Sequence, residues 1–193
     1  MFKKILSLGV ICIFMFAVSC KSPTAITTSS GPKKEITYDE LRITITVPEY
    51  VKKADLEVGF PAERLDFTNS SNRVQVPDIN IMRIAFLDSD KNEIKKIDES
   101  NAEIIRNQFM ENRVKDNSQI LKDIGFTEIN GHKAINFKEK FEYKNMIVAD
   151  DVYIIEDEDG FLVVFISINH NGSGNIEFDP AMVEAVKSIR FVK

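Results

Sequence analysis

The chain has 193 residues, of which 44% are hydrophobic and 28% are charged, and its 25 basic and 30 acidic residues give a formal net charge of −5. A negative, evenly mixed surface argues against a nucleic-acid partner. The sequence contains two cysteines, both within its first twenty residues, so we expect no disulfide framework in the domain, and the fold must rest on its hydrophobic core.

The N-terminus has the three parts of a secretory signal peptide. Lys3 and Lys4 form a charged start, residues 5–18 are almost entirely apolar, and a small residue precedes Cys20. A membrane-spanning helix needs about 20 apolar residues, so this run is too short to remain as an anchor. We therefore expect residues 1–19 to be removed as a signal peptide. Loss of two of the 25 basic residues leaves 23 against 30 acidic ones, a net charge near −7.

Residues 17–20, Ala-Val-Ser-Cys, resemble the lipobox of bacterial lipoproteins. The resemblance implies that the sulfur of Cys20 receives a diacylglyceryl group, that the chain is cut before it, and that the new amino terminus is acylated with a chain such as palmitate. Each buried methylene contributes about 0.8 kcal/mol, and a single chain holds a protein only marginally. We predict a lipid-anchored protein of the bacterial cell envelope, on the periplasmic face or at the cell surface. Because the net charge is negative, contact with the membrane should come from the lipid alone.

Two segments follow the signal peptide. Residues 20–37 are rich in Ser, Thr, Pro and Lys and contain too little apolar surface to order themselves, so they are predicted to form a lipidated, flexible tether. Residues 38–193 have the length of one domain, without an internal repeat or a second linker. Cys12 leaves with the signal peptide, so Cys20 is the one cysteine of the mature chain.

Strand patterns open the domain, and a helix follows them. Residues 41–47 alternate strictly between apolar and polar and stop at Pro48, as a half-buried strand does. Residues 79–87 form a second apolar run of strand length. Residues 99–117 are predicted to form a helix with its apolar side chains on one stripe. The stripe consists of Ala102, Ile105 and Phe109, with Met110 at its edge and Ile104 nearly opposite.

Two dipeptides predict tight hairpin turns, because they supply the positive φ angles that two-residue hairpins need. They are Asn130-Gly131, between residues 126–129 and 133–143, and Asp159-Gly160, between residues 152–155 and 161–168. Antiparallel pairing of the strands on either side of each turn is therefore expected.

The end of the chain combines a fully apolar strand with a helix. Residues 161–166 are apolar on both faces, so a layer must cover each side, and helices are the obvious candidates. Residues 180–188 are predicted to form a helix with Asp179 as its N-cap and Pro180 in the first position. Its inward-facing residues are Met182, Val183 and Val186. Residues 188–192 then return to strand, which gives an α+β domain with a largely antiparallel sheet.

Short motifs along residues 38–193 carry a resemblance. They are Val47-Pro48-Glu49-Tyr50, Ile129–Ala134, Tyr153, Phe161–Ile166 and Val186–Phe191. Their order resembles the PsbP-like superfamily, which is named for an extrinsic photosystem subunit and includes a nuclear Ran-binding factor and many bacterial lipoproteins. The resemblance implies an αβα sandwich, in which two or more helices cover an antiparallel sheet. It also implies a non-catalytic protein that works by contact with a partner, although fold and function are only loosely tied.

One acidic segment has the spacing of an EF-hand-type calcium loop. Asp88, Asp90 and Asn92 alternate along the chain, and Glu99 lies eleven residues after Asp88. Such a loop needs a glycine at its sixth place, where this sequence has Glu93, and a preceding helix, where this sequence has a strand pattern. The four residues are candidate metal ligands, but a solvated turn leading into a capped helix is the favoured interpretation.

Three other polar features are also interpreted as turns or loops rather than sites. Residues 156–159 are four consecutive acidic residues whose carboxylates could bind a cation. They precede Gly160 at a predicted hairpin tip, where solvent-exposed charged residues are common. His132 and His170 each flank a turn glycine, and zinc usually takes three or four ligands. Residues 172–174, Gly-Ser-Gly, lack the spacing of a nucleophile elbow.

The sequence therefore predicts no catalytic residue, resident metal or cofactor. The leading interpretation is a non-catalytic binding or interaction module whose partner, a protein or a small ligand, the sequence does not identify. Two alternatives stay open: an envelope enzyme or divalent-metal-dependent factor built from dispersed carboxylates, and a purely structural envelope lipoprotein. Melting with and without divalent ions separates the first alternative, because an ion that binds only the native state raises thermal stability.

Overall fold

The structure, a computed structural model, describes most of the domain that follows the tether. The described ranges are residues 31–54, 62–67, 79–88, 94, 96–110, 118–143, 146–170 and 176–193. At a few of these positions only the backbone is described: residues 79, 80, 88, 109, 110, 143, 146, 169 and 170. Within these ranges the chain forms two antiparallel sheets and two helices.

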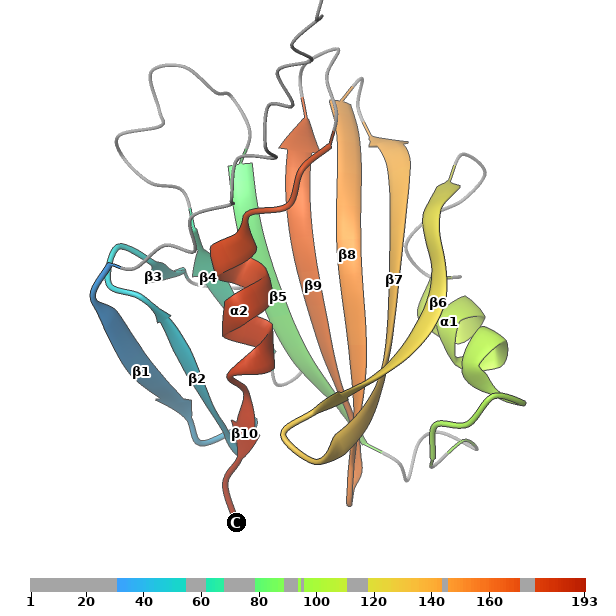
Figure 1. The fold of residues 1–193 in the computed structure, drawn as a ribbon, viewed down its shortest axis with the longest axis horizontal. Helices are drawn as coiled ribbons and strands as arrows, with labels where there is room; N and C mark the ends of the chain where they lie inside the picture. Colours follow the sequence, from blue (N-terminus) through green and yellow to red (C-terminus); the bar gives the residue numbers. More distant parts are fainter. Residues whose placement is uncertain are drawn as a thin grey trace, which may run out of the picture.

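The larger sheet has seven strands, and every neighbouring pair is antiparallel. In spatial order the strands are β3 (Lys52–Ala54), β4 (Ala62–Asp66), β5 (Ile79–Asp88), β9 (Gly160–His170), β8 (Met146–Asp157), β7 (His132–Tyr143) and β6 (Gln119–Ile129). Figure 1 shows this sheet in the middle of the molecule, with one helix in front of it and the other behind β6. The predicted strands at 79–87, 152–155 and 161–168 are confirmed within β5, β8 and β9.

The smaller sheet has three strands in the order β1-β2-β10. β2 (Ile43–Pro48) confirms the alternating pattern of residues 41–47, because Ile43, Ile45 and Val47 are all buried. β10 (Arg190–Phe191) is the predicted terminal strand, and it pairs with β2.

The first strand, β1 (Lys33–Tyr38), corrects the boundary of the predicted tether. Residues 33–37 are paired with β2 rather than forming part of a linker. Their composition is polar, yet alternate residues turn toward the domain, where Ile36 packs against the core and Tyr38 is buried. The remainder of the predicted tether lies outside the described residues, apart from the short lead into β1.

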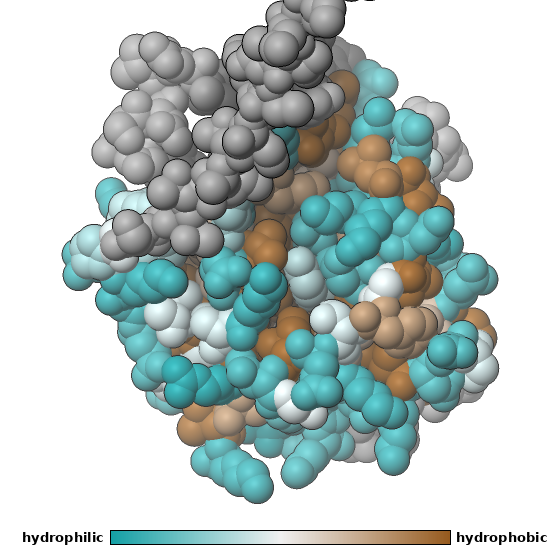
Figure 2. Space-filling view, in the orientation of Figure 1, coloured by the Kyte–Doolittle hydropathy of each residue, from teal (hydrophilic) through white to brown (hydrophobic). Residues whose placement is uncertain are grey.

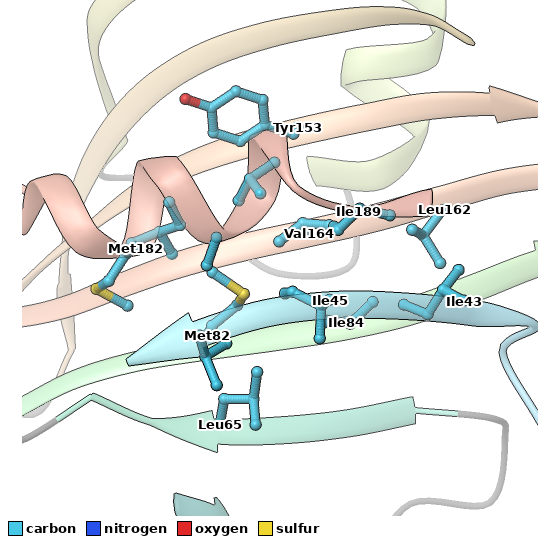
Figure 3. Close-up of a cluster of buried hydrophobic side chains, with 14 of the residues drawn as sticks. Ile43, Ile45, Leu65, Met82, Ile84, Tyr153, Leu162, Val164, Met182 and Ile189 are labelled. Atoms are coloured by element: carbon cyan, nitrogen blue, oxygen red, sulfur yellow. The ribbon is translucent and has the colours of Figure 1, made fainter. Parts of the chain in front are cut away.

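One face of the large sheet is covered by β2 together with α2 (Pro180–Lys187). The buried side chains meet in one cluster that joins both sheets, as Figure 3 shows for part of it. Its members include Ile43 and Ile45 of β2, Leu65 of β4, Met82 and Ile84 of β5, Leu162 and Val164 of β9, Met182 of α2, and Ile189. Helix α2 begins where predicted, and Met182 and Val186 are buried as expected, while Val183 is half-buried.

The opposite face is covered by α1 (Ala102–Met110). Ala102 and Ile105 pack with Ile97 against buried residues of β7, β8 and β9, which are Ile135, Phe137, Val152, Ile154, Phe161 and Val163. Ile104 is 51% exposed, as its place opposite the stripe predicted. The last part of the predicted helix, residues 111–117, lies outside the described residues.

Both faces of β9 are therefore covered, and the α+β class is confirmed, but the covering layers differ from the expected pair of helical layers. One face carries α1, whereas the other carries α2 and a strand of the second sheet. The short α2 spans only part of that face, so β2 supplies much of the apolar surface that closes the core.

Both predicted hairpins are present. Asn130 and Gly131 have φ angles of 48° and 88°, and they join a β6 that ends at Ile129 to a β7 that starts at His132, which is a type I′ arrangement. In the second hairpin Asp157 pairs with Gly160, so the turn residues are Glu158 and Asp159, one position earlier than predicted. Asp159 keeps a negative φ there, and Gly160 is the first residue of β9.

Candidate functional site

A cleft of about 420 Å³ runs between α2 and the small sheet. It is lined by residues of β1, β2 and α2 and by Ser188, the C-cap of α2. The residues from the three elements are Lys33, Thr46, Pro48, Pro180, Ala181, Glu184, Ala185 and Lys187. Its walls are small or apolar at the centre and charged at the edges. The volume lies within the range of ligand pockets, and the lining mixes polar side chains with small apolar ones.

The local sequence of α2 explains how this cleft forms. The carboxylate of Asp179 accepts a hydrogen bond from the backbone N–H of Ala181 at 2.8 Å, which confirms it as the N-cap. At the other end, the hydroxyl of Ser188 accepts a hydrogen bond from the N–H of Thr46 at 2.8 Å and so ties the helix to β2. Between these ties, Ala181 and Ala185 present short side chains, which leaves space between helix and strand.

The rim of the cleft carries charge and receives the N-terminal segment. Glu184 and Lys187 form an ion pair at 3.1 Å on the exposed side of α2. Lys33 lies on the opposite rim and is the first residue of β1. The chain therefore enters the domain at the edge of the cleft.

Tyr50 connects the start of α2 to the turn after β2. It packs against the cluster that joins both sheets, and its hydroxyl lies near the carboxylate of Asp179. Burial, followed by the charge of Asp179, raises the pKa of Tyr50. The aromatic motif Val47–Tyr50 thus positions the helix that forms one wall of the cleft.

Tyr50 and Tyr153 are expected to ionise later than free tyrosine, whose pKa is about 10. Burial, with a contribution from Asp151, also raises the pKa of Tyr153. Because the folded pKa values are raised, the stability from the neutral hydroxyls is complete below pH of about 10 and is lost as pH rises above it. An ultraviolet titration of the folded protein should show a late phase that shrinks in Tyr153→Phe. Ionisation of every tyrosine in one early phase would contradict this expectation.

Of the four calcium-loop candidates, Glu99 is the one whose side chain the structure describes. The backbone of Asp88 ends β5, Asp90 and Asn92 lie outside the described residues, and Glu99 is exposed in the turn before α1. The neighbouring Asp98 forms the cap instead, since its Oδ1 accepts hydrogen bonds from the N–H groups of Ser100 at 2.8 Å and Asn101 at 3.1 Å. The hydroxyl of Ser100 also donates to Oδ1 at 2.6 Å, and this hydrogen bond is the main cause that lowers the pKa of Asp98.

The acidic run at 156–159 makes specific contacts in addition to lying at a hairpin tip. Arg42 contacts the carboxylates of Asp159 at 2.7 Å and Asp157 at 3.3 Å. Glu156 accepts a hydrogen bond from the N–H of Ile97 at 2.7 Å. Arg42 has a φ of 53°, a left-handed conformation in the turn before β2. These contacts connect the turn before β2 and the segment before α1 to the large sheet.

His132 lies directly after the Asn130-Gly131 turn, as its position in the sequence predicted, and makes contacts there. Its Nδ1 lies 2.9 Å from the carbonyl oxygen of Glu156, and its ring lies 4.3 Å from the ring of Phe191, measured between centroids. Only the backbone of His170 is described, at the end of β9. Cys20 and residues 172–174 lie outside the described residues.

Metal-ligating side chains do not gather anywhere in the described part of the chain. No group of three or more His, Cys, Asp or Glu side chains within it is arranged to hold a metal ion. The helices in the same part of the chain are also too short or too polar to cross a membrane.

Sequence reasoning missed a buried polar cluster on the large sheet. Asn136 of β7 and Asp151 of β8 are 6% and 0% exposed, and they lie on the face that α2 partly covers. Asp151 interrupts an apolar strand at an inward position, and Asn136 does the same between Ala134 and Lys138. This break in alternation was the available signal, because inward polar residues need partners when they are buried.

No protein-family model matches the sequence, and no curated protein is significantly similar to it. Several solved structures are similar. Cyanobacterial PsbP from Synechocystis sp. PCC 6803 is 10% identical, with a TM-score of 0.52, over 88% of this chain and 99% of PsbP. LpqN of Mycobacterium tuberculosis, described as involved in cell envelope biogenesis, is 13% identical, with a TM-score of 0.47, over 86% of this chain and 88% of LpqN.

A protein from Bacteroides thetaiotaomicron is 14% identical, with a TM-score of 0.47, over 83% of this chain and 48% of that protein. This chain thus spans about half the length of the Bacteroides protein. At these identities the similarity concerns the fold, and the likeness to cyanobacterial PsbP agrees with the order of elements described above. The chain therefore has a PsbP-like fold.

Proposed function

We propose that this protein is a non-catalytic binding module, anchored by lipid on Cys20 in the bacterial cell envelope, and that its partner binds in the cleft beside α2. The observation that carries the proposal is the position of the cleft. Its rim includes Lys33, which lies thirteen residues after Cys20. Because an extended chain spans at most about 3.6 Å per residue, the tether would keep the cleft within about 45 Å of the bilayer.

The shape and chemistry of the cleft support a binding role. Short side chains leave room at its centre, and charged side chains at its rim offer orienting contacts to a ligand or peptide segment. The cleft is built by α2 and β2, which both belong to the core, so its walls are held by buried contacts. A partner would meet a preformed surface.

The lipid anchor is tested by Cys20→Ser, with Cys12→Ser as the matched control. Growth with an alkyne-labelled fatty acid should label the wild type and Cys12→Ser in the membrane fraction. Cys20→Ser should lose the label, and it should keep its signal peptide. Equal labelling of the two variants would overturn the anchor.

Binding in the cleft is tested in living cells with a photo-crosslinking residue. Placed at Glu184 on the rim, it should give a discrete adduct, because this side chain is 48% exposed beside the cleft. The same residue at Glu103, exposed on α1, is the matched control on the opposite face. Adducts from both positions, or from neither, would count against the cleft as the binding site, whatever the outcome at Cys20.

A further inference from the structure

A second polar site lies on the large sheet, on the side of α2 away from the small sheet. Asn136 donates a hydrogen bond from Nδ2 to Oδ1 of Asp151 at 2.5 Å, and both side chains are buried. Lys122 of β6 donates from Nζ to Oδ1 of Asn136 at 2.9 Å. Lys138 of β7 forms an ion pair with Oδ2 of Asp151 at 3.1 Å. One buried amide–carboxylate pair therefore holds two ammonium groups, one from each of two neighbouring strands.

Lys122 and Lys138 are the residues of this cluster whose side chains solvent reaches most. Asp151 is 0% exposed, whereas the side chain of Lys138 is 30% exposed and Lys122 is exposed. Figure 2 shows hydrophilic residues over much of this face, which Figure 1 presents in the same orientation. A ligand that approaches the sheet here meets positive charge, while the balancing carboxylate lies beneath it.

Each ammonium group keeps donor capacity for a ligand. An ammonium carries three N–H donors, and within the described residues each of these two has a single polar partner. Lys138 also lies over the ring of Phe178, with Nζ 4.6 Å from the ring centroid, which restricts its position further. Donors that are held in place before binding lose less freedom when a ligand arrives.

The charge of Lys122 exceeds what the buried pair requires. Asp151 already accepts a hydrogen bond from Asn136 and forms an ion pair with Lys138, and the hydroxyl of Tyr153 donates to it at 3.5 Å. The oxygen of Asn136 needs a donor, but a neutral donor would serve. A purely structural cluster would therefore contain one lysine. The second positive charge is notable because the chain as a whole is acidic.

We propose that Lys122 and Lys138 form a binding site for an oxyanion, a phosphate or carboxylate group whose oxygens accept from both ammonium groups. Lys140 lies two positions beyond Lys138 on the same face of β7 and adds a third positive charge at its edge. Charge-assisted hydrogen bonds from two lysines suit an anion with several oxygens. This site is separate from the cleft beside α2, and it does not depend on the lipid anchor.

The test uses Lys122→Gln, which keeps an N–H donor and removes the charge. Inorganic phosphate, acetate and vesicles containing phosphatidylglycerol are titrated separately into the full chain, and amide and lysine NMR signals are followed at constant ionic strength. Phosphate or acetate should shift signals of β6 and β7 in the wild type. In Lys122→Gln the affinity should fall by about tenfold, as the loss of one charge-assisted contact implies. Response to vesicles but not to free anions would assign the oxyanion to a lipid headgroup.

Lys133→Gln is the matched control, because Lys133 is an exposed lysine of the same strand on the opposite face. It should bind the anion like the wild type. Lys122→Glu, with the charge reversed at an exposed position, should abolish binding while the protein still melts cooperatively. Equal affinity in the wild type, Lys122→Gln and Lys122→Glu would overturn the site, as would an absence of signal shifts with all three probes.

Discussion

Replacing Lys138 with methionine is expected to lower the free energy of unfolding by about 2 to 3 kcal/mol at neutral pH. The side chain of Lys138 is 30% exposed, but its partner Asp151 is 0% exposed. Methionine preserves the apolar stem and its packing against Phe178 while it removes the charge. Among the described residues, Asp151 would then keep Asn136 and the hydroxyl of Tyr153 as its side-chain donors while it remains buried. Chemical denaturation of both proteins measures the difference.

The double variant Lys138→Met, Asp151→Asn should recover most of this loss. An amide at position 151 still offers an oxygen to Asn136, and it leaves no uncompensated charge in the core. Lys133→Met, which removes an exposed charge from the same strand, should change stability by no more than about 0.5 kcal/mol. An equally small loss of stability in Lys138→Met and Lys133→Met would show that the buried carboxylate of Asp151 does not depend on Lys138.

Phe137→Ala is expected to cost about 3 to 5 kcal/mol, the usual range for a fully buried aromatic residue. Phe137 is 2% exposed and packs in the cluster beneath α1. Its removal leaves a cavity in the cluster that also contains Ile105 of α1 and Ile154 of β8, so α1 loses part of its attachment to the sheet. We expect a lower denaturation midpoint together with faster amide exchange in α1.

Phe126→Ala is the control for this substitution. Phe126 is an aromatic residue of the adjacent strand on the same face, but it is 52% exposed. Its loss should change stability by about 0.5 kcal/mol or less. A similar cost for both substitutions would mean that α1 does not seal this part of the core.

Elements with strong local patterns could be predicted from the sequence. The alternation of β2, the apolar run of β9, the Asn130-Gly131 turn and the Asp179 cap all depend on neighbouring residues, and all four are confirmed. Each of these signals reflects local backbone geometry or burial on one side, so the element can be predicted without knowledge of the tertiary structure.

Features that depend on distant contacts could not be predicted. β1 contains one aliphatic residue and is recognisable as a strand only through its pairing with β2. The cleft forms because the short side chains of Ala181 and Ala185 face β2, which the pattern of α2 alone does not show. The cluster around Asp151 joins three strands, so its donors come from positions that the sequence keeps well apart.

The pairing of β10 with β2 has a consequence for the order of folding. Arg190 and Phe191 align with Thr44 and Ile43, and the N–H of Val192 donates to the carbonyl of Arg42 at 2.8 Å. These contacts close a loop that contains nearly the whole domain, and such non-local closure is slow and comes late. The apolar side of β2 lacks α2 as a partner until the ribosome has synthesised residues 180–187. The newly made polypeptide therefore passes through a long interval in which this layer is still open.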